Sequence, residues 1–170
     1  MAYLKHIDLA ERPGAKELAQ IASAEHGDIV ESALMDATLR GADRSAWLPE
    51  AITQADATVA RIDNAVAEAD ATIDGFLTRR GYVLPLFPVP TIVTGWSRAI
   101  ARYLLHKNRQ SMESTDPIVR DYRDALKLLG LTAEGKFSLG ATDTVVAAAA
   151  DVRFTSDPAV FDRRELKAFR

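Results

Sequence analysis

The carboxylates Asp70 and Asp74 are the residues whose type and spacing come nearest to a catalytic pair. They lie four residues apart in a stretch with helical periodicity, so one helix face would carry a general acid and a general base. Several arginines are expected near this face: Arg79, Arg80, Arg98 and Arg102. Because structural ion-pair networks imitate active sites, we expect a structural role for both carboxylates and an ion pair between Asp74 and one of these arginines.

The stretch from Gly130 to Lys136 matches a phosphate-binding loop up to its last position. That position holds Phe137, where a Ser or Thr hydroxyl would reach a magnesium ion. A phosphate loop also follows a strand and opens a helix, whereas this stretch follows a predicted helix, which we expect Gly130 to end, and leads to Gly140. The context therefore disfavours a nucleotide site.

The histidines and serines form no further catalytic or metal-binding pattern. His6, His26 and His106 lie far apart, without the spacing of a metal site. The sequence has no Gly-x-Ser-x-Gly elbow and no glycine-rich dinucleotide fingerprint. It has no cysteine, which excludes disulfides and thiolate metal sites. We therefore expect a protein that is not an enzyme and that holds no cofactor and no metal.

Length and composition indicate one globular domain. The chain has 170 residues, of which 48% are hydrophobic and 26% charged, as in ordinary globular proteins. Its net charge of -3 lacks the basic excess of a free-standing nucleic-acid binder. No apolar run approaches the roughly 18 to 20 residues of a membrane span, and we see no secretory signal at the N-terminus. We expect no sequence-specific binding of nucleic acid and no membrane association.

A corner between two helices, from Ala69 to Pro90, is the feature that the rest of the chain is expected to pack against. The helix before it, predicted from about Glu50 to Thr78, carries apolar residues at steps of three and four: Val59, Ile62, Val66, Ala69, Ile73, Phe76 and Leu77. Gly81 can adopt the positive φ that ends a helix. The prolines that follow lack an N–H, so 82–90 is predicted to be a rigid, extended connector.

Further helices are expected on either side of this corner. One or two short helices fall within 2–23, and another runs from an Asp28 N-cap to about Arg40, with Ile29 on its apolar stripe. After the corner, helices are predicted over about 91–108 and from the Asp116 N-cap to Gly130. One core is expected to hold Ile73, Phe76, Leu77, Leu84, Trp96, Ile100, Tyr103, Tyr122, Leu126 and Leu129.

The predicted fold class is all-α: mainly a helical bundle of about five helices with a proline-rich extended elbow and an extended C-terminal tail. The helical domain covers 1–140, with 28–54 interpreted as an added element, and the arm-like tail covers 141–170. The tail carries large aromatic residues without regular periodicity, which suits an interface, although they could also fold back on their own domain. The candidate interface residues are Phe154, Phe161, Arg163, Leu166 and Phe169.

Several motifs, in the right order along the chain, resemble the family of Mu-like phage proteins known as gene product thirty-six, a phage domain of unknown function. The central motif holds Asp70, Ile73, Asp74, Gly75, Leu77, Arg80, Tyr82, Pro85 and Pro90, and further matches hold Arg102, Tyr103 and Tyr122. The chain departs from the family pattern at Gly81, an extra residue, and between His26 and Ile52, where it is longer.

The resemblance implies a structural protein of the head–tail neck, a connector or adaptor subunit for head completion. Such a subunit would form a homo-oligomeric ring at the portal vertex and contact portal or neck proteins. It would reside in the virion neck, and in the host cytoplasm during assembly. DNA could pass through the lumen, because an acidic ring does not hold phosphates. The alternatives are a helical regulatory module of a prophage that binds another protein, and a nucleotide-binding enzyme that uses Lys136 or the pair Asp70 and Asp74.

Overall fold

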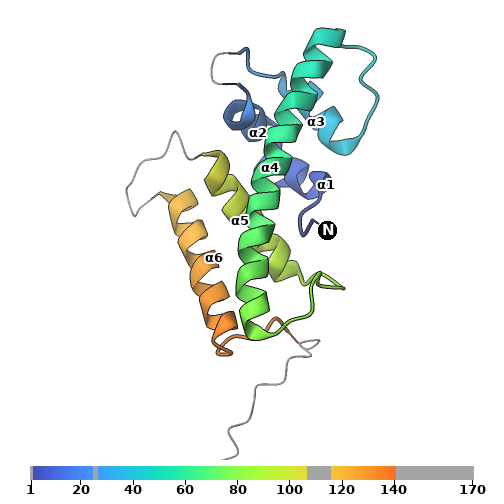
Figure 1. Cartoon of the computed structure of the whole chain (residues 1–170). Coiled ribbons are helices and arrows are strands. Elements are labelled where there is room, and N and C mark those ends of the chain that lie inside the picture. Colours follow the sequence, from blue (N-terminus) through green and yellow to red (C-terminus); the bar gives the residue numbers. More distant parts are fainter. Residues whose placement is uncertain (1, 25–26, 107–115, 141–170) are drawn as a thin grey trace, which may run out of the picture.

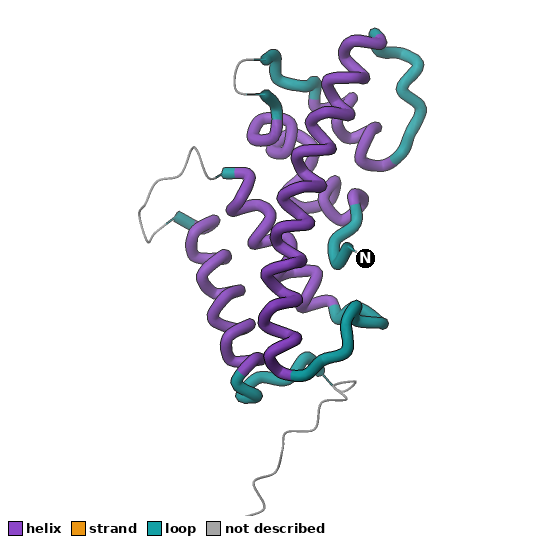
Figure 2. The backbone as a smooth tube through the Cα atoms, in the orientation of Figure 1, coloured by secondary structure: helices purple, strands orange, loops and turns teal. Residues whose placement is uncertain are grey.

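The computed structural model describes residues 2–24, 27–106 and 116–140, and every regular element in these ranges is helical, which confirms the all-α prediction (Figures 1 and 2). In chain order the elements are α1 (His6–Leu9), the π-helical turn η1 (Ala10–Gly14), α2 (Ala15–Ala22), α3 (Ser32–Arg40), α4 (Pro49–Arg80), α5 (Thr91–Leu105) and α6 (Pro117–Ala133).

Helix α4 is the axis of the molecule. It has 32 residues and is therefore about 48 Å long. Helices α2 and α3 pack along its N-terminal half, with α1 against α3, whereas α5 and α6 pack together along its C-terminal half (Figure 1). Its inward face carries the predicted stripe, with Ile62, Ala69, Ile73 and Leu77 fully buried. The long helix was thus predicted with bounds correct to two residues.

The corner after α4 forms as predicted. Gly81 takes a φ of 93°, and both its N–H and that of Tyr82 donate to the Leu77 carbonyl at 3.1 Å. Left-handed glycine with these bonds closes the helix end. The connector 82–90 then runs without regular structure until Pro90, which caps α5.

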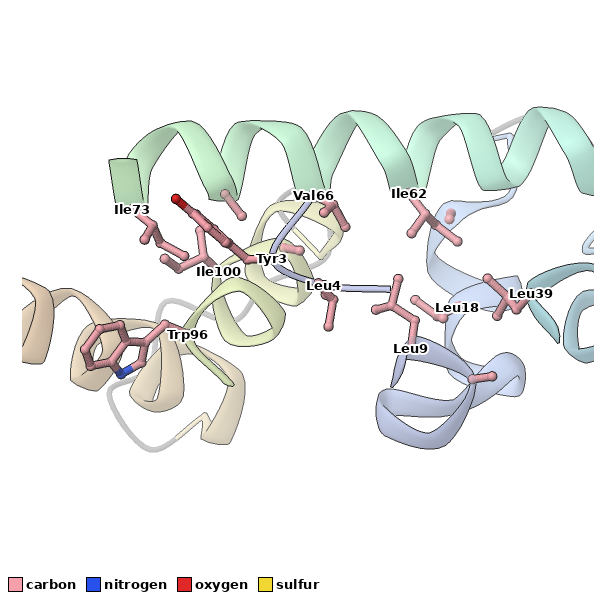
Figure 3. Close-up of a cluster of buried hydrophobic side chains, with 14 of the residues drawn as sticks. Tyr3, Leu4, Leu9, Leu18, Leu39, Ile62, Val66, Ile73, Trp96 and Ile100 are labelled. Atoms are coloured by element: carbon pink, nitrogen blue, oxygen red, sulfur yellow. The ribbon is translucent and has the colours of Figure 1, made fainter. Parts of the chain in front are cut away.

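A single core joins both halves of α4 (Figure 3). It runs from Leu18 and Leu39 at one end, past Leu4 and Val66, to Trp96 and Ile100 at the other. Most of the predicted core residues lie in it or against it: Ile73, Phe76, Leu77, Leu84, Trp96, Ile100, Tyr122, Leu126 and Leu129. Tyr103 is the exception, since it is half-buried and stacks on Tyr122 at the edge, with ring centroids 3.8 Å apart.

The start of α3 corrects one prediction. Asp28 does not cap this helix, which begins at Ser32 after Glu31. The backbone N–H of Val30 donates to Ser23 Oγ at 3.2 Å, and Val30 is buried. This anchored, extended segment turns Ile29 outward, where it is 62% exposed. Helix α3 itself packs on α2 and α4 in the common core; that 28–54 is an addition within a family stays a prediction.

The helix ends after the corner also differ from the predicted ones. Helix α5 ends at Leu105, about three residues early. Helix α6 continues through Gly130 to Ala133. Glycine inside a helix costs about 1 kcal/mol relative to alanine, but full burial of Leu129 and Thr132 outweighs that penalty. The turn comes instead at Gly135, whose φ is 76°.

Candidate functional site

The two carboxylates that resembled a catalytic pair hold the N-terminal segment against α4. Asp70 is only 8% exposed and accepts hydrogen bonds from the backbone N–H of Tyr3 at 2.9 Å and from Ser97 Oγ at 2.7 Å. Burial raises the pKa of Asp70, although both hydrogen bonds act to lower it. This one side chain therefore joins the N-terminal segment, α4 and α5.

Asp74 lies one turn further along α4 and accepts a hydrogen bond from the phenolic hydroxyl of Tyr3. Thr94 Oγ1 donates to the Tyr3 carbonyl at 3.1 Å, so α5 holds the same residue. Figure 3 shows the Tyr3 ring between α4 and α5, with its hydroxyl pointing toward α4. Burial raises the pKa of Tyr3, and the hydrogen bond to Asp74 raises it further, because the neutral phenol is the donor.

The predicted ion pair between Asp74 and an arginine is wrong. Among the described residues, no ion pair includes Asp70 or Asp74. Arg80 is turned away toward Gly135, and Arg102 is held by another carboxylate. The position of Tyr3 was the missing information, since it is 71 residues distant from Asp74 in the chain.

An open depression of about 610 Å³, lined by residues of α4 and of the N-terminal segment, lies beside this cluster. Lys5, His6, Asp63 and Asp74 provide its polar rim, and His6 Nε2 lies 2.6 Å from Asp63 Oδ1. The carboxylates on this rim already have protein partners. In the residues that the structure covers, no group of three or more potential metal ligands occurs.

The stretch that resembled a phosphate loop has a different structure. Gly130 to Ala133 belong to α6, and Lys136 lies after the helix C-terminus, where it pairs with Glu134 at 2.8 Å. A phosphate loop needs the opposite arrangement, with the N–H groups of a helix N-terminus facing the anion. The guanidinium of Arg80 packs under the turn, and a Cβ on Gly135 would lie 2.9 Å from Arg80 Cζ. Arg80 thus supports the end of α6.

Arg102 on α5 holds α2 through a forked ion pair. Its Nε and Nη2 atoms donate to the two carboxylate oxygens of Glu17 at 2.5 and 2.9 Å, and His106 Nε2 lies 3.1 Å from the same carboxylate. Partial burial acts to raise the pKa of Glu17, but the hydrogen bonds from Arg102 and His106 lower it below its ordinary value. Glu17 was missed because no local pattern marks a partner 85 residues away.

The connector between α4 and α5 exposes two large apolar side chains, which we call the elbow pair: Val83 and Phe87. Each is 87% exposed, whereas Tyr82 and Leu86 are buried and anchor the connector to the core. In an extended chain successive side chains alternate in direction. Residues 82–87 form a continuous apolar run, so a segment that buries Tyr82 and Leu86 has to turn other apolar side chains outward, and this run was the signal that could have predicted the exposed surface.

The remaining motif residues have simpler places. Gly75 is exposed near the C-terminal end of α4, and no atom lies within 4 Å of where its Cβ would be. Pro85 is exposed in the connector.

None of the helices in the described ranges has the length and apolarity needed to cross a membrane. The candidate interface residues lie outside the described ranges: Phe154, Phe161, Arg163, Leu166 and Phe169.

Comparison with known proteins agrees with the motifs. Residues 3–156 match the model of the family described as Bacteriophage Mu, Gp36. The chain is also similar to the Mu-like prophage FluMu protein gp36 of Haemophilus influenzae, with 40% identity over 113 residues that cover 66% of this chain and 74% of the relative. The family match includes the whole corner and both of its helices. This chain therefore belongs to the Bacteriophage Mu Gp36 family of phage proteins.

Proposed function

We propose that this phage protein is a head–tail connector or adaptor subunit, which forms a homo-oligomeric ring at the portal vertex. It acts through protein contacts and has no enzymatic activity. Its partners are further copies of itself and the portal or neck proteins, and it resides in the virion neck after assembly in the host cytoplasm. Membership of the Mu Gp36 family supports the phage context of this proposal.

The observation that carries the proposal is the elbow pair. Two apolar side chains that are 87% exposed are unfavourable in water unless another surface covers them. The connector is rigid because prolines restrict its backbone and because Tyr82 and Leu86 are anchored in the core. A rigid, projecting apolar group binds at a low cost in conformational entropy, which suits a contact between subunits.

Ring formation requires a heterologous interface, in which one surface of a subunit binds a different surface of the next. The elbow pair provides one of these surfaces at the end of α4 where the chain turns into α5. The net charge of -3 would keep DNA phosphates from adhering to a ring through which DNA passes.

Native mass spectrometry of the full chain, alone and with its cognate portal protein, tests the proposal. We expect a closed ring in the sample that contains portal protein, whether or not the chain alone already forms one. A protein that stays monomeric or dimeric in both samples would contradict it and would favour a regulatory module that binds a different protein.

Two variants identify the contact. The double variant Val83→Ser/Phe87→Ser, which replaces the elbow pair, should abolish the ring and leave the fold intact. The matched control is Leu48→Ser, which alters a 72% exposed apolar residue at the opposite end of α4 and should assemble normally. Deletion of residues 152–170, the proposed arm, should likewise give a folded monomer. Normal assembly of the deletion variant would exclude the arm.

A further inference from the structure

A small cavity on the side of α5 gathers positive charge from separate elements. It has a volume of about 250 Å³, and its lining includes Arg12 of η1, Arg98 and Arg102 of α5, and Asp121 of α6. Gly95 contributes a surface without a side chain. We call this cavity the arginine pocket.

The guanidinium groups of the arginine pocket differ in their partners. Arg102 is bound by Glu17. Arg98 is half-buried, and its Nε is fully buried without a hydrogen-bond partner. No side-chain hydrogen bond or ion pair connects Arg12 or Arg98 with another residue in the described ranges. A buried, unpaired N–H of a charged group is rare in folded proteins because its desolvation is not compensated.

We propose that the arginine pocket binds a carboxylate group. The planar guanidinium fork matches the two oxygens of a carboxylate, and the side chains of Arg12 and Arg98, which line the cavity, have no carboxylate partner among the described residues. The carboxylate of Asp121 on the pocket wall disfavours a doubly charged phosphate, and the net charge of -3 disfavours a nucleic-acid backbone.

The volume fits an acidic side chain or a small free acid, and it is below that of an ordinary cofactor pocket. Both sources present the same chemical group, so the test includes both. The pocket lies on α5 and does not involve the elbow pair. The inference therefore holds or fails independently of ring assembly.

Titration of the full-length, ¹⁵N-labelled protein, followed at the Nε–Hε signal of Arg98 and the backbone amide of Gly95, tests the inference. The probes are acetate, a blocked Gly-Glu-Gly peptide, its Gly-Gln-Gly counterpart and inorganic phosphate. We expect saturable shifts with acetate, the Glu peptide or both, and binding at least about tenfold weaker for the Gln peptide and for phosphate. Response to acetate alone indicates a free acid, and tighter binding of the Glu peptide indicates a protein side chain.

Variants separate a binding role from a structural one. Arg98→Met should abolish the shifts at Gly95 and raise the melting temperature, because it removes the unpaired buried N–H. Asp121→Asn should strengthen acetate binding several-fold, since it removes a repulsive charge. Arg123→Met alters an exposed arginine of α6 that does not line the pocket, and this control should change neither property.

Three results would overturn the inference: no saturable shift with either carboxylate probe, equal binding of phosphate or of the Gln peptide, or unchanged carboxylate binding in Arg98→Met.

Discussion

The phenolic hydroxyl of Tyr3 donates a hydrogen bond to the carboxylate of Asp74, across 71 residues of chain. The backbone N–H of the same tyrosine donates to Asp70, one helical turn away. Two acidic residues of the family motif thus fasten the N-terminal segment into the angle between α4 and α5. The carboxylates that most resembled catalytic groups are structural anchors in this protein, and their removal should affect stability.

Asp70→Ala should lower the free energy of unfolding by about 2 to 4 kcal/mol, because the Tyr3 N–H and the Ser97 hydroxyl both lose their buried acceptor. Tyr3→Phe should cost only about 0.5 to 1.5 kcal/mol, because half-buried Asp74 can regain water. Urea unfolding measures both values. Equal costs for the two variants would show that Asp70 is not the principal anchor.

The stability difference between the wild type and Asp70→Asn should shrink as the pH rises. The pKa of Asp70 is raised in the folded state, so between its ordinary value of about 3.9 and that raised value the folded protein holds a proton that the unfolded chain has released. In that window, rising pH reduces the contribution of Asp70. Urea unfolding from about pH 3 to 7 measures the difference.

Glu17 should show the opposite sign. Its pKa is lowered in the folded state, so its contribution is complete above the ordinary value of about 4.3 and is lost as the pH falls through the lowered value. The difference between the wild type and Glu17→Gln should therefore grow with rising pH. If both differences grow with rising pH, the assignment of Asp70 is contradicted, and if both shrink, that of Glu17 is.

Two glycines of the former phosphate-loop candidate should respond in opposite directions to alanine. Gly130→Ala lies inside α6 with no atom within 4 Å of the new Cβ, so it should stabilise the protein by about 0.5 to 1 kcal/mol. Gly135→Ala forces a φ of 76° on alanine and crowds the Arg80 guanidinium, so it should destabilise by about 1 to 2 kcal/mol. Thermal unfolding measures whether each variant is stabilised or destabilised. A loss of stability in Gly130→Ala would indicate that α6 ends at Gly130, as the sequence pattern predicted.

The features that local chemistry determines were predictable from the sequence. The long helix follows from apolar spacing, and its end follows from a left-handed glycine and the prolines behind it. The helix boundaries that depend on tertiary burial could not be predicted from the sequence. Val30, held by Ser23, delays α3, and the burial of Leu129 and Thr132 carries α6 past Gly130.

The hydrogen-bond and ion-pair partners within the candidate sites could also not be predicted from the sequence. Periodicity placed Asp70 and Asp74 correctly on one face of α4, but it contains no information about which distant residue meets that face. The bonds from Tyr3 to Asp74 and from Arg102 to Glu17 join elements far apart in the chain. Only the packing of the N-terminal segment and α2 against α4 and α5 decides them.

Two isoleucines that were both assigned to apolar helix stripes provide a matched test of this packing. Ile73 is fully buried where α4 meets α5, whereas Ile29 is 62% exposed ahead of α3. Ile73→Ala should therefore cost about 2 to 5 kcal/mol through lost burial and a residual cavity, and Ile29→Ala should stay within about 0.5 kcal/mol of the wild type. Chemical denaturation of both variants makes the comparison. A large loss for Ile29→Ala would return that residue to the core and place the start of α3 where its sequence pattern predicted it.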